Sequence, residues 1–462
     1  MRVKKGQQFE VVVDDMVFGG RGLVKVDGLA VFVDQAVPGD RAEIRIVKKK
    51  RSFAEARVVR IIDPSPFRVT PPCRYAGYCG GCKWQFIDYP MQLEYKRRHV
   101  AESMEHIGLL RNIKVHEVIP SPRIFRYRNK MEFSCSDRRW LLPEEMDKEG
   151  TDMGFALGLH VPGTFHKVLD IDSCLLFPDL GNAILEDVRQ YMKESDMPVY
   201  GLRSHEGFWR FLMLRHSSAH DRWLVNIVTA AEDNAAVKPL ADRLMEKYPQ
   251  IISIVNNITA RKAGIAVGEY EILLAGETCL KDKINDFEFE ISANSFFQTN
   301  TPGAEQLYRT VEKYAGLTGS EMVADLYSGT GTIAICLSAG AGEVMGIEIV
   351  ESAVADAEKN CALNNISNCR FIAGDIKDCL SNITDVPDVM IIDPPRAGMH
   401  KDVVKQVLDM APPKLVYVSC NPATLARDLN LVRDQYRVLE VQPVDMFPHT
   451  FHIESVARLE RI

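Results

Sequence analysis

The sequence predicts an α/β protein in three parts: a small β-barrel over residues 1–62, a mixed α+β region over 63–285 and a doubly wound, Rossmann-like parallel sheet over 286–462. Three observations predict this division. The first part reads as short strands separated by glycine-rich turns. The second opens with three cysteines in the spacing C-x5-C-x2-C. In the third, strands alternate with helical stretches, which is the pattern of a parallel sheet with helices on both faces.

The charge of the chain is unevenly distributed. Residues 1–140 carry 27 Lys and Arg against 16 Asp and Glu, whereas residues 141–462 carry 29 against 47. A basic front end on an acidic chain indicates a nucleic-acid partner. The first residues lack the apolar core of a signal peptide, and no stretch approaches the roughly 18 apolar residues of a membrane-spanning helix. We therefore expect a cytoplasmic protein with no membrane partner.

The first part consists of alternating apolar and polar segments. F-E-V-V-V is followed by a G-G-R-G turn, and then by L-V-K-V, A-V-F-V and A-E-I-R-I-V with D-G and P-G-D turns between them. The alternation and turn spacing predict a barrel of the OB type. The basic run K-K-K-R at 48–51 favours a solvated strand end and a nucleic-acid contact equally.

A proline-rich linker leads into the cysteine cluster, which comprises Cys73, Cys79 and Cys82. A total of 11 cysteines in a cytoplasmic chain argues against a disulfide framework. Three thiolates at this spacing indicate a metal site with a distant fourth ligand, and the spacing alone does not separate zinc from an iron–sulfur cluster.

Helices are expected at three places in the second part. Residues 86–117 are expected to be largely helical and to pack on the third part, because Leu93, Val100 and Met104 fall near one helical face. Further helices are expected near 179–194 and 235–248.

Between these helices, F-R-Y-R-N-K interleaves basic and aromatic residues on an expected strand. Phe125, Arg126, Tyr127, Arg128 and Lys130 are therefore candidates for a nucleic-acid surface, and a half-buried strand with solvated basic residues is the alternative.

Five strands of the third part are predicted from apolar runs, at 322–327, 343–348, 370–373, 389–393 and 415–419. The helical stretches between and after them are expected near 331–339, 350–364, 401–411 and 422–434. Two last strands, 436–444 and 454–460, have no helix between them and predict an antiparallel hairpin that closes the sheet.

A glycine turn follows the first of these strands. Gly329-x-Gly331-x-x-Ala334 opens a helix, and Glu348 ends the next strand. This spacing is typical of nucleotide binding and suits both NAD and S-adenosylmethionine. No histidine or lysine site for hydride transfer is evident, and Asp393-Pro394-Pro395 after the fourth strand is a methyltransferase feature. Asp393 could also be a helix N-cap.

Cys420 follows the fifth strand, where open α/β sheets carry their reactive groups. A buried cysteine after a strand is usually core packing, but Asn421-Pro422 forces a turn at this point. Methyltransferases of amino groups also use Asp-Pro-Pro and need no thiol. Cys420 therefore favours methylation of carbon.

Five strings together resemble the RNA 5-methyluridine methyltransferases: F-F-Q-T-N, D-L-Y-S-G-T-G-T, D-P-P-R, S-C-N-P-A-T-L-A-R-D-L and H-T-F-H-I-E. The front end resembles a TRAM domain, and the cysteine cluster resembles the iron–sulfur site of the 23S ribosomal-RNA branch. The resemblance covers nearly the whole chain and is weakest over 180–285.

The resemblance implies roles for individual residues. Cys420 matches the family's nucleophile, and Glu454 matches its general base, for which an ordinary surface carboxylate is the alternative. Phe296 resembles the aromatic residue that stacks on the extruded uracil, with a core phenylalanine as the alternative. The substrate contacts expected beside it are Arg126 and Arg128. The residues expected at S-adenosylmethionine are Gln298, Tyr327, Thr332, Glu348, Asp375 and Asp393.

For the cysteine cluster, the resemblance implies a [4Fe-4S] cofactor with Cys174 as the distant ligand; Cys135 is the other candidate. The cofactor is expected to be structural or to position RNA, since methyl transfer needs no redox step. A radical S-adenosylmethionine enzyme is disfavoured because it needs a C-x3-C-x2-C cluster beside the cofactor.

The expected function is S-adenosylmethionine-dependent methylation of a uridine C5 in RNA, with ribosomal RNA first. A transfer-RNA enzyme and a non-catalytic RNA-binding protein are the alternatives. RNA is the expected partner, no DNA partner is expected, and we expect a monomer.

Overall fold

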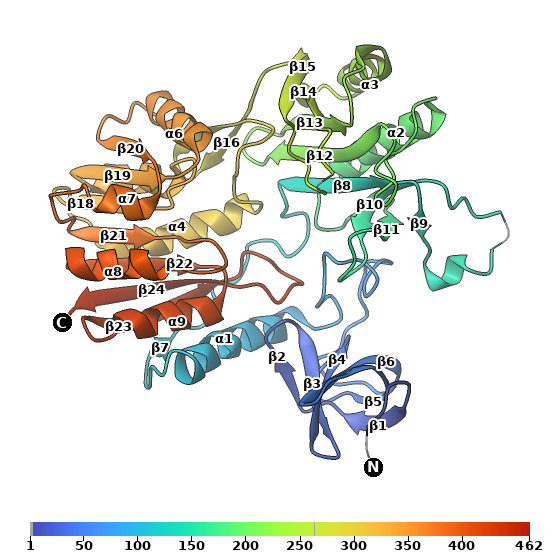
Figure 1. The fold of residues 1–462 in the computed structure, drawn as a ribbon, viewed down its shortest axis with the longest axis horizontal. Helices are drawn as coiled ribbons and strands as arrows, with labels where there is room; N and C mark the ends of the chain where they lie inside the picture. The colour runs from blue at the N-terminus through green and yellow to red at the C-terminus, as the bar shows by residue number, and fades with distance from the viewer. Residues whose placement is uncertain (1–2, 149, 263) are drawn as a thin grey trace.

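The computed structural model describes residues 3–148, 150–262 and 264–462, and it arranges them around three β-sheets and a separate hairpin (Figure 1). The N-terminal sheet lies at one end of the molecule, and the central and C-terminal sheets lie side by side beyond it. None of the helices in these ranges is long and apolar enough to cross a membrane.

The N-terminal sheet curls around an apolar core, as the alternation of its sequence predicts. Its strands are β1 (Gln8–Val12), β2 (Asp15–Val17), β3 (Arg21–Val26), β4 (Leu29–Asp34), β5 (Arg41–Lys49) and β6 (Phe53–Asp63), in the spatial order β1-β5-β6-β4-β3-β2. Alternate residues of β3 and β5 point inward, so that Val24, Ile44 and Ile46 are buried. The predicted small barrel is confirmed.

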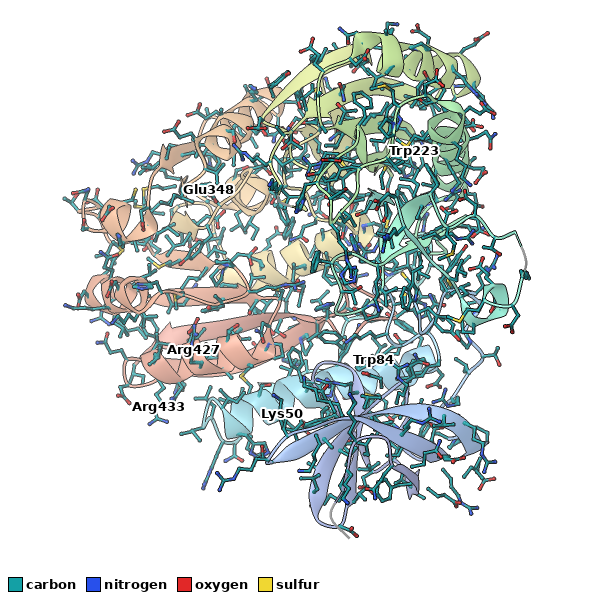
Figure 2. All side chains as sticks on the ribbon, turned by 45° about the vertical axis from the view of Figure 1, so that its right-hand side comes forward. Lys50, Trp84, Trp223, Glu348, Arg427 and Arg433 are labelled. Carbon is teal, nitrogen blue, oxygen red and sulfur yellow. The ribbon has the colours of Figure 1, made fainter. Side chains whose placement is uncertain are left out.

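The chain then crosses residues 64–88 to α1 (Tyr89–His106), whose first turn contains Pro90. Trp84, in the crossing, is fully buried where the barrel meets α1 (Figure 2). Val100 and Met104 of α1 belong to the core of the C-terminal sheet, so the helix packs on that sheet as expected.

The predicted helical stretch was too long, because α1 ends at His106. Gly108 follows, where a Cβ would lie 2.7 Å from the carbonyl oxygen of Met104, and Leu109 and Asn112 both have left-handed φ angles. The chain turns there and forms the short strand β7 (Lys114–Val115) instead of continuing as a helix.

The central sheet has eight strands in the order β15-β14-β13-β12-β8-β10-β11-β9. They are β8 (Lys130–Ser136), β9 (Arg139–Trp140), β10 (Ala156–His160), β11 (Val168–Asp170), β12 (Trp209–Ser217), β13 (Arg222–Thr229), β14 (Ile251–Ile258) and β15 (Tyr270–Gly276), with a 3-10 turn, η1 (Pro143–Glu145). The helices α2 (Asp179–Glu194) and α3 (Asn234–Lys247) start and end within one residue of the predicted positions, and they share one core with Trp209 and Trp223.

The expected strand around F-R-Y-R is absent, and residues 124–129 form a loop. Arg126 has φ 53°, and the backbone N–H groups of Arg126 and Arg128 donate to the carbonyl oxygens of Leu175 and Leu176. The left-handed residue breaks the alternation of a strand, and β8 begins only at Lys130.

The C-terminal sheet has the order β20-β19-β18-β21-β22-β24-β23-β7. Its main strands are β18 (Met322–Leu326), β19 (Glu343–Glu348), β20 (Cys369–Ala373), β21 (Val389–Ile392), β22 (Lys414–Ser419), β23 (Tyr436–Val444) and β24 (Glu454–Arg461). The first five run parallel, and β24 pairs antiparallel with both β22 and β23. The chain reverses its direction of winding between β18 and β21. The doubly wound sheet and its final hairpin are thus confirmed.

Helices cover both faces of this sheet. One face packs on α4 (Thr301–Ala315), α5 (Thr332–Leu337), α6 (Glu351–Leu363) and the hairpin β16 (Leu280–Ile284)–β17 (Phe287–Ile291), with the 3-10 turn η2 (Ser338–Gly340) after α5. The other packs on α1, α7 (Ile376–Leu380), α8 (Lys401–Met410) and α9 (Pro422–Val432). The domain boundary predicted after residue 285 falls in the turn of this hairpin. Buried side chains of both its strands belong to the C-terminal core.

Sequence patterns did not reveal β7, which adds to the edge of the C-terminal sheet by pairing parallel to β23. Two residues are too few for a periodic pattern. The central sheet is consequently inserted, in sequence, between β7 and the rest of the sheet that β7 joins.

Candidate active site and cysteine pocket

A cleft of about 1060 Å³ opens at the carboxyl ends of β18, β21 and β22. This is the edge at which open α/β sheets bind ligands, beside the point where the winding reverses. Nine of the residues predicted from sequence line it: Arg128, Phe296, Gln298, Tyr327, Thr332, Glu348, Asp393, Cys420 and Glu454.

Local sequence fixes the position of Cys420 between β22 and α9. Asn421 caps α9 by accepting a hydrogen bond from the Ala423 N–H at 3.1 Å, and Pro422 occupies the first turn. The strand ends at Ser419, which pairs with Ser455 of β24. Cys420 directly follows Ser419, and Glu454 directly precedes Ser455, so both residues lie at the same end of this strand pair.

Burial dominates the electrostatics of the three reactive groups. It raises the pKa of Glu454 to about 8, and the nearby Asp393 adds to this rise. Burial also raises the pKa of Asp393 to about 6. The pKa of Cys420 rises to about 11, through burial first and the charge of Glu454 second, while Arg396 opposes the rise.

The glycine turn is organised by Glu348. One carboxylate oxygen accepts the Gly329 N–H at 3.0 Å, and the other accepts the Val350 N–H at 2.9 Å. A Cβ at Gly329 would meet nothing within 4 Å, so the space before this turn is open. At Gly331, by contrast, φ is 76° and a Cβ would lie 2.8 Å from Phe371, which explains the glycine.

This end of the cleft fits S-adenosylmethionine. The carboxylate of Glu348 is held at the mouth of the turn, where a ribose would bind, and Tyr308 and Thr332 share a hydrogen bond of 3.1 Å beside it. The half-buried Tyr327 has a left-handed φ of 65°, which turns the chain directly after β18.

Phe296 is 70% exposed, whereas the adjacent Phe297 is 4% exposed and belongs to the core. The alternative of a core phenylalanine at 296 is therefore wrong. Its loop is held from the central sheet, because Arg215 of β12 donates to the carbonyl oxygens of Ala293 and Ser295. Asn129 likewise donates to the carbonyl oxygen of Gln298 at 2.8 Å.

Some predicted residues lie elsewhere. Asp375 caps α7 by accepting the Lys377 N–H, and it does not line the cleft. Arg126 is exposed and paired with Asp179. Tyr127 is buried and donates to the carbonyl oxygen of Pro448, and Phe125 stacks on His449 with 4.4 Å between ring centroids. Both aromatic rings thus make packing contacts, with Tyr127 buried and Phe125 half-buried.

Among the cleft residues that sequence reasoning missed are Arg396, Thr450 and His452. All three stand inside strings that carried the family resemblance, D-P-P-R and H-T-F-H-I-E. The family resemblance of these two strings could therefore have identified all three residues. Burial lowers the pKa of His452 to about 4, and Arg396 contributes to this, so the imidazole is neutral near pH 7.

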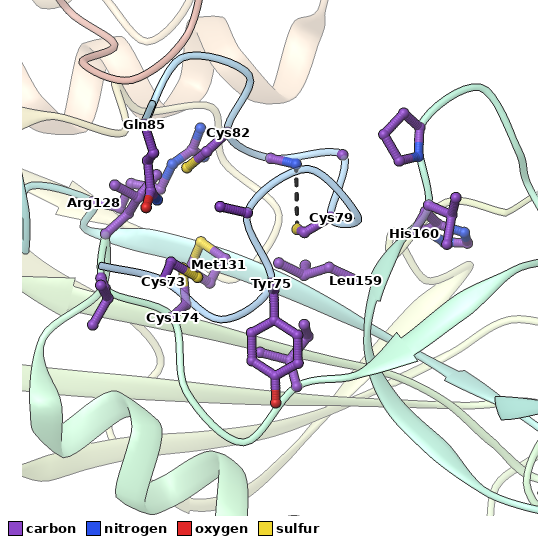
Figure 3. Close-up of a pocket in the computed structure, with 18 of the residues that line it drawn as sticks. Cys73, Tyr75, Cys79, Cys82, Gln85, Arg128, Met131, Leu159, His160 and Cys174 are labelled. Atoms are coloured by element: carbon purple, nitrogen blue, oxygen red, sulfur yellow. Dashed lines mark hydrogen bonds between the residues drawn. The ribbon is translucent and has the colours of Figure 1, made fainter. Parts of the chain in front are cut away.

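The four predicted cysteine ligands, Cys73, Cys79, Cys82 and Cys174, line a second cavity of about 500 Å³ (Figure 3). Burial raises the pKa of Cys79 and of Cys82 to about 12, and the charges of Cys174 and Cys73 contribute to both rises. Cys135, the alternative ligand, lies buried in β8 and outside this cavity. Lys130 and Arg128 also line the cavity, and Arg128 lines the cleft as well.

The donor set of this cavity fits a metal cluster, because four soft thiol ligands face one space. Within residues 3–148, 150–262 and 264–462, no three potential ligands converge tightly enough to hold a single metal ion.

Two family models match the chain. One, described as tRNA (Uracil-5-)-methyltransferase, matches residues 231–462, and the other, described as TRAM domain, matches residues 2–59.

Similar proteins span the whole chain. An "Uncharacterized RNA methyltransferase" of Chlorobaculum tepidum is 42% identical over 472 residues, which is 100% of this chain and 98% of that protein. Another from Porphyromonas gingivalis is 42% identical over 97% of this chain and 99% of its own length. Among solved structures, the Pyrococcus abyssi tRNA (uracil-54, C5)-methyltransferase in complex with S-adenosyl-L-homocysteine has a TM-score of 0.76 at 28% identity, covering 98% of this chain and 100% of that one.

Proposed function

The chain belongs to the tRNA (uracil-5-)-methyltransferase family and is an S-adenosylmethionine-dependent RNA methyltransferase, and we propose that it methylates uridine C5 through a covalent bond between Cys420 and C6. One observation carries the proposal, namely that Cys420, Glu454 and Asp393 line one cleft beside the Gly329 turn. A nucleophile, a base and a cofactor site at one sheet edge are what this reaction requires.

The chemistry explains why a thiol is needed. Uracil C5 is a weak nucleophile, so the thiolate of Cys420 first donates an electron pair to C6 and converts the ring into an enolate. S-adenosylmethionine supplies an electrophilic methyl group on a sulfonium. The enolate C5 forms the new bond to that methyl group while the methyl–sulfur bond breaks, and its electron pair stays on the sulfur of the departing thioether.

Glu454 then completes the cycle. Its carboxylate removes the proton from C5, the C5–C6 double bond re-forms, and the thiolate of Cys420 leaves. A pKa of about 8 supports this role, because a base with a pKa near the working pH accepts a proton more readily than an exposed glutamate does. Arg396 stabilises the thiolate, since it lowers the pKa of Cys420 against the effect of burial.

The uridine must leave its stack to reach the thiol, because the ring edge is otherwise inaccessible. The exposed Phe296 supplies a face on which a base can stack, and Arg128 supplies a charge at the same cleft. Single-stranded or looped RNA lowers the cost of extrusion.

We assign 23S ribosomal RNA as the substrate, on the resemblance of the four cysteines to the ribosomal branch. Transfer RNA is the second candidate, and the similarity to a tRNA (uracil-54, C5)-methyltransferase over 98% of the chain favours it. Mapping 5-methyluridine in both RNA classes from a deletion strain decides between them.

We further propose that Cys73, Cys79, Cys82 and Cys174 hold a [4Fe-4S] cluster. Four thiols that line one cavity support a metal site, and the resemblance of their spacing to the family's iron–sulfur site favours a cluster over zinc. The cluster would have a structural role, since the groups proposed to carry out methyl transfer, Cys420, Glu454 and Asp393, lie at the C-terminal sheet.

The covalent mechanism is tested with RNA that contains 5-fluorouridine. Fluorine cannot leave as a proton does, so wild-type enzyme with S-adenosylmethionine should form an adduct that survives denaturing electrophoresis. Cys420→Ala should form no adduct and no 5-methyluridine while keeping the circular dichroism spectrum of the wild type. Methylation by the alanine variant would exclude the thiol as nucleophile.

A further inference from the structure

The segment between β23 and β24 connects the cleft to the rest of the molecule. This segment, residues 445–453, is called the base loop below. Its residues Phe447, Thr450 and His452 line the cleft, and Glu454 follows it directly. Val444 pairs with Glu454 across the two strands, so both ends of the base loop meet at the base.

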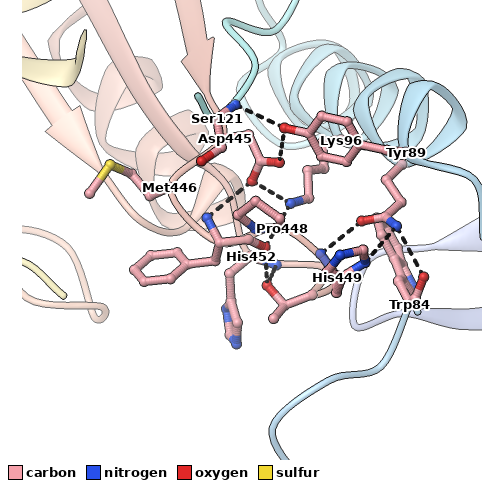
Figure 4. Close-up of polar contacts among 12 residues, drawn as sticks. Trp84, Tyr89, Lys96, Ser121, Asp445, Met446, Pro448, His449 and His452 are labelled. Carbon is pink, nitrogen blue, oxygen red and sulfur yellow. Dashed lines mark hydrogen bonds and ion pairs between the residues drawn. The ribbon is translucent and has the colours of Figure 1, made fainter. Parts of the chain in front are cut away.

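A buried ion pair anchors the start of the base loop (Figure 4). Lys96 of α1 donates to Asp445 at 2.6 Å and to the carbonyl oxygen of Phe447 at 3.0 Å. The hydroxyl of Tyr89, also on α1, donates to the second oxygen of Asp445 at 2.9 Å and accepts the Ser121 N–H at 2.8 Å. Two side chains of α1 thus hold the carboxylate of Asp445, next to the residue that pairs with Glu454.

The middle of the base loop is anchored to the same helix. The side-chain oxygen of Gln92 accepts the His449 N–H at 2.8 Å, and its amide nitrogen lies 3.2 Å from the His449 ring. The backbone N–H groups of Lys83 and Trp84 both donate to the carbonyl oxygen of His449. His449 has a left-handed φ of 64°, a conformation that its neighbours must enforce.

The helix α1 also contacts the barrel. His99 makes a contact of 2.9 Å with the carbonyl oxygen of Met16, and Arg98 pairs with Asp15 of β2. The barrel also contacts the base loop directly, because Phe18 packs edge-on against Phe451 with 5.7 Å between centroids. One helix therefore contacts both the RNA-binding barrel and the base loop.

Burial makes this pair unusual. Among the ion pairs of the described residues, Lys96–Asp445 is the one in which both side chains are fully buried. Desolvating two charges offsets most of their attraction, so such a pair adds little net stability compared with apolar side chains. Its strong directionality, in contrast, fixes geometry, and at this position the geometry that it fixes is that of the base loop.

We propose that α1 positions the general base: Lys96, Tyr89 and Gln92 hold the base loop so that Glu454 faces C5, and docking of the barrel on the same helix couples RNA binding to that alignment. The proposal rests on the proposed function. These residues do not touch the substrate and act as positioning residues.

The first test compares two tyrosine hydroxyl groups that form hydrogen bonds near opposite ends of β23. Tyr89→Phe removes the hydroxyl that binds Asp445 at one end of β23, and Tyr436→Phe removes a buried hydroxyl that donates to Pro412 at the other end. We expect Tyr89→Phe to lower kcat about tenfold, since small misplacements of catalytic groups cost up to about 100-fold. The KM for RNA and the affinity for S-adenosylmethionine should stay unchanged. Because proton removal slows, Tyr89→Phe should also accumulate the adduct with ordinary uridine RNA.

Tyr436→Phe should show neither effect. Equal kcat and equal adduct levels in the two variants would overturn the proposal. Lys96→Met should give a larger fall in kcat than Tyr89→Phe, and Phe18→Ala, which leaves the buried pair intact, should raise the adduct level if the barrel is coupled. Unchanged adduct in Phe18→Ala would overturn the coupling.

Glu454→Gln separates this proposal from the proposed function. If Glu454→Gln accumulates adduct and Tyr89→Phe does not, the positioning role fails alone. If neither Glu454→Gln nor the fluorouridine RNA gives an adduct, the covalent mechanism fails and the positioning role fails with it.

Discussion

At the residue scale, Cys420 and Glu454 lie at the same end of the paired strands β22 and β24, and burial favours the neutral form of both. The reaction needs the thiolate of Cys420, and Arg396 is the cation placed to stabilise it, because its charge lowers the pKa of the thiol against the effect of burial. For Glu454, a pKa of about 8 makes both the carboxylate and the acid accessible near neutral pH.

Glu454→Gln should separate addition from elimination. The amide keeps the size of the side chain but accepts no proton, so addition and methyl transfer proceed and the C5 proton stays. We expect a covalent adduct with unmodified RNA to accumulate in stoichiometric amount, and turnover to fall about 100-fold or more, as is usual for a general base. Electrophoresis under denaturing conditions and quantification of released 5-methyluridine measure both effects. A variant with neither adduct nor methylation would assign proton removal to another group.

The raised pKa of Glu454 also predicts how stability depends on pH. The unfolded chain has the ordinary value of 4.5 and the folded chain about 8, so the folded state holds more protons between these values. Stability should therefore be fully present below about pH 4.5 and fall as the pH rises towards 8. In Glu454→Gln this decline should be smaller. Urea unfolding at pH 5.5 and pH 8.5 measures the difference between the two proteins, and an identical decline in both would contradict the assigned pKa.

At the element scale, we expect the C-terminal sheet to keep part of its activity when the cysteine site is lost. Cys82→Ser removes one of four thiols that line the second cavity. Purified without air, the wild type should be brown with about four irons per chain, and the variant should be bleached. Hydrogen exchange should quicken around residues 73–90 and 174, while some methyl transfer to a short RNA persists. Stoichiometric zinc without iron in the wild type would overturn the cluster and leave the methyltransferase intact.

Elements with a long periodic pattern were predictable from the sequence, and short ones were not. The helices α2 and α3 and the parallel strands follow directly from apolar spacing. By contrast, β7 has only two residues. The sequence of residues 124–129 predicts a strand, but Arg126 has a left-handed φ and the segment forms a loop. The resemblance likewise identified the residues at strand ends, whereas Arg396 and His452 were missed because a string of letters does not say which side chains face a cleft.

At the scale of the whole molecule, the excess of positive charge before residue 140 should govern RNA affinity. Lys50 and Arg51 are exposed in the turn between β5 and β6, and Lys50 is labelled in Figure 2. Each phosphate contact contributes about 0.7 to the slope of log affinity against log salt for single strands, so Lys50→Ala with Arg51→Ala should reduce that slope by about 1.4. Lys238→Ala with Lys247→Ala, on the distant α3, is the matched control and should leave the slope unchanged. Equal slopes in all three proteins would remove this turn from the RNA interface.

The position of α1 in the sequence has a consequence for synthesis of the protein. Lys96 and Asp445 are 349 positions apart. At roughly 5 to 20 residues per second, translation reaches the base loop about 20 to 70 s after α1 has been made. During this time Lys96 lacks its partner Asp445, and the apolar side chains Val100 and Met104 are not yet covered by the C-terminal sheet. Assembly of the catalytic half must be among the last events of folding, and a chain released early would expose a surface that chaperones bind.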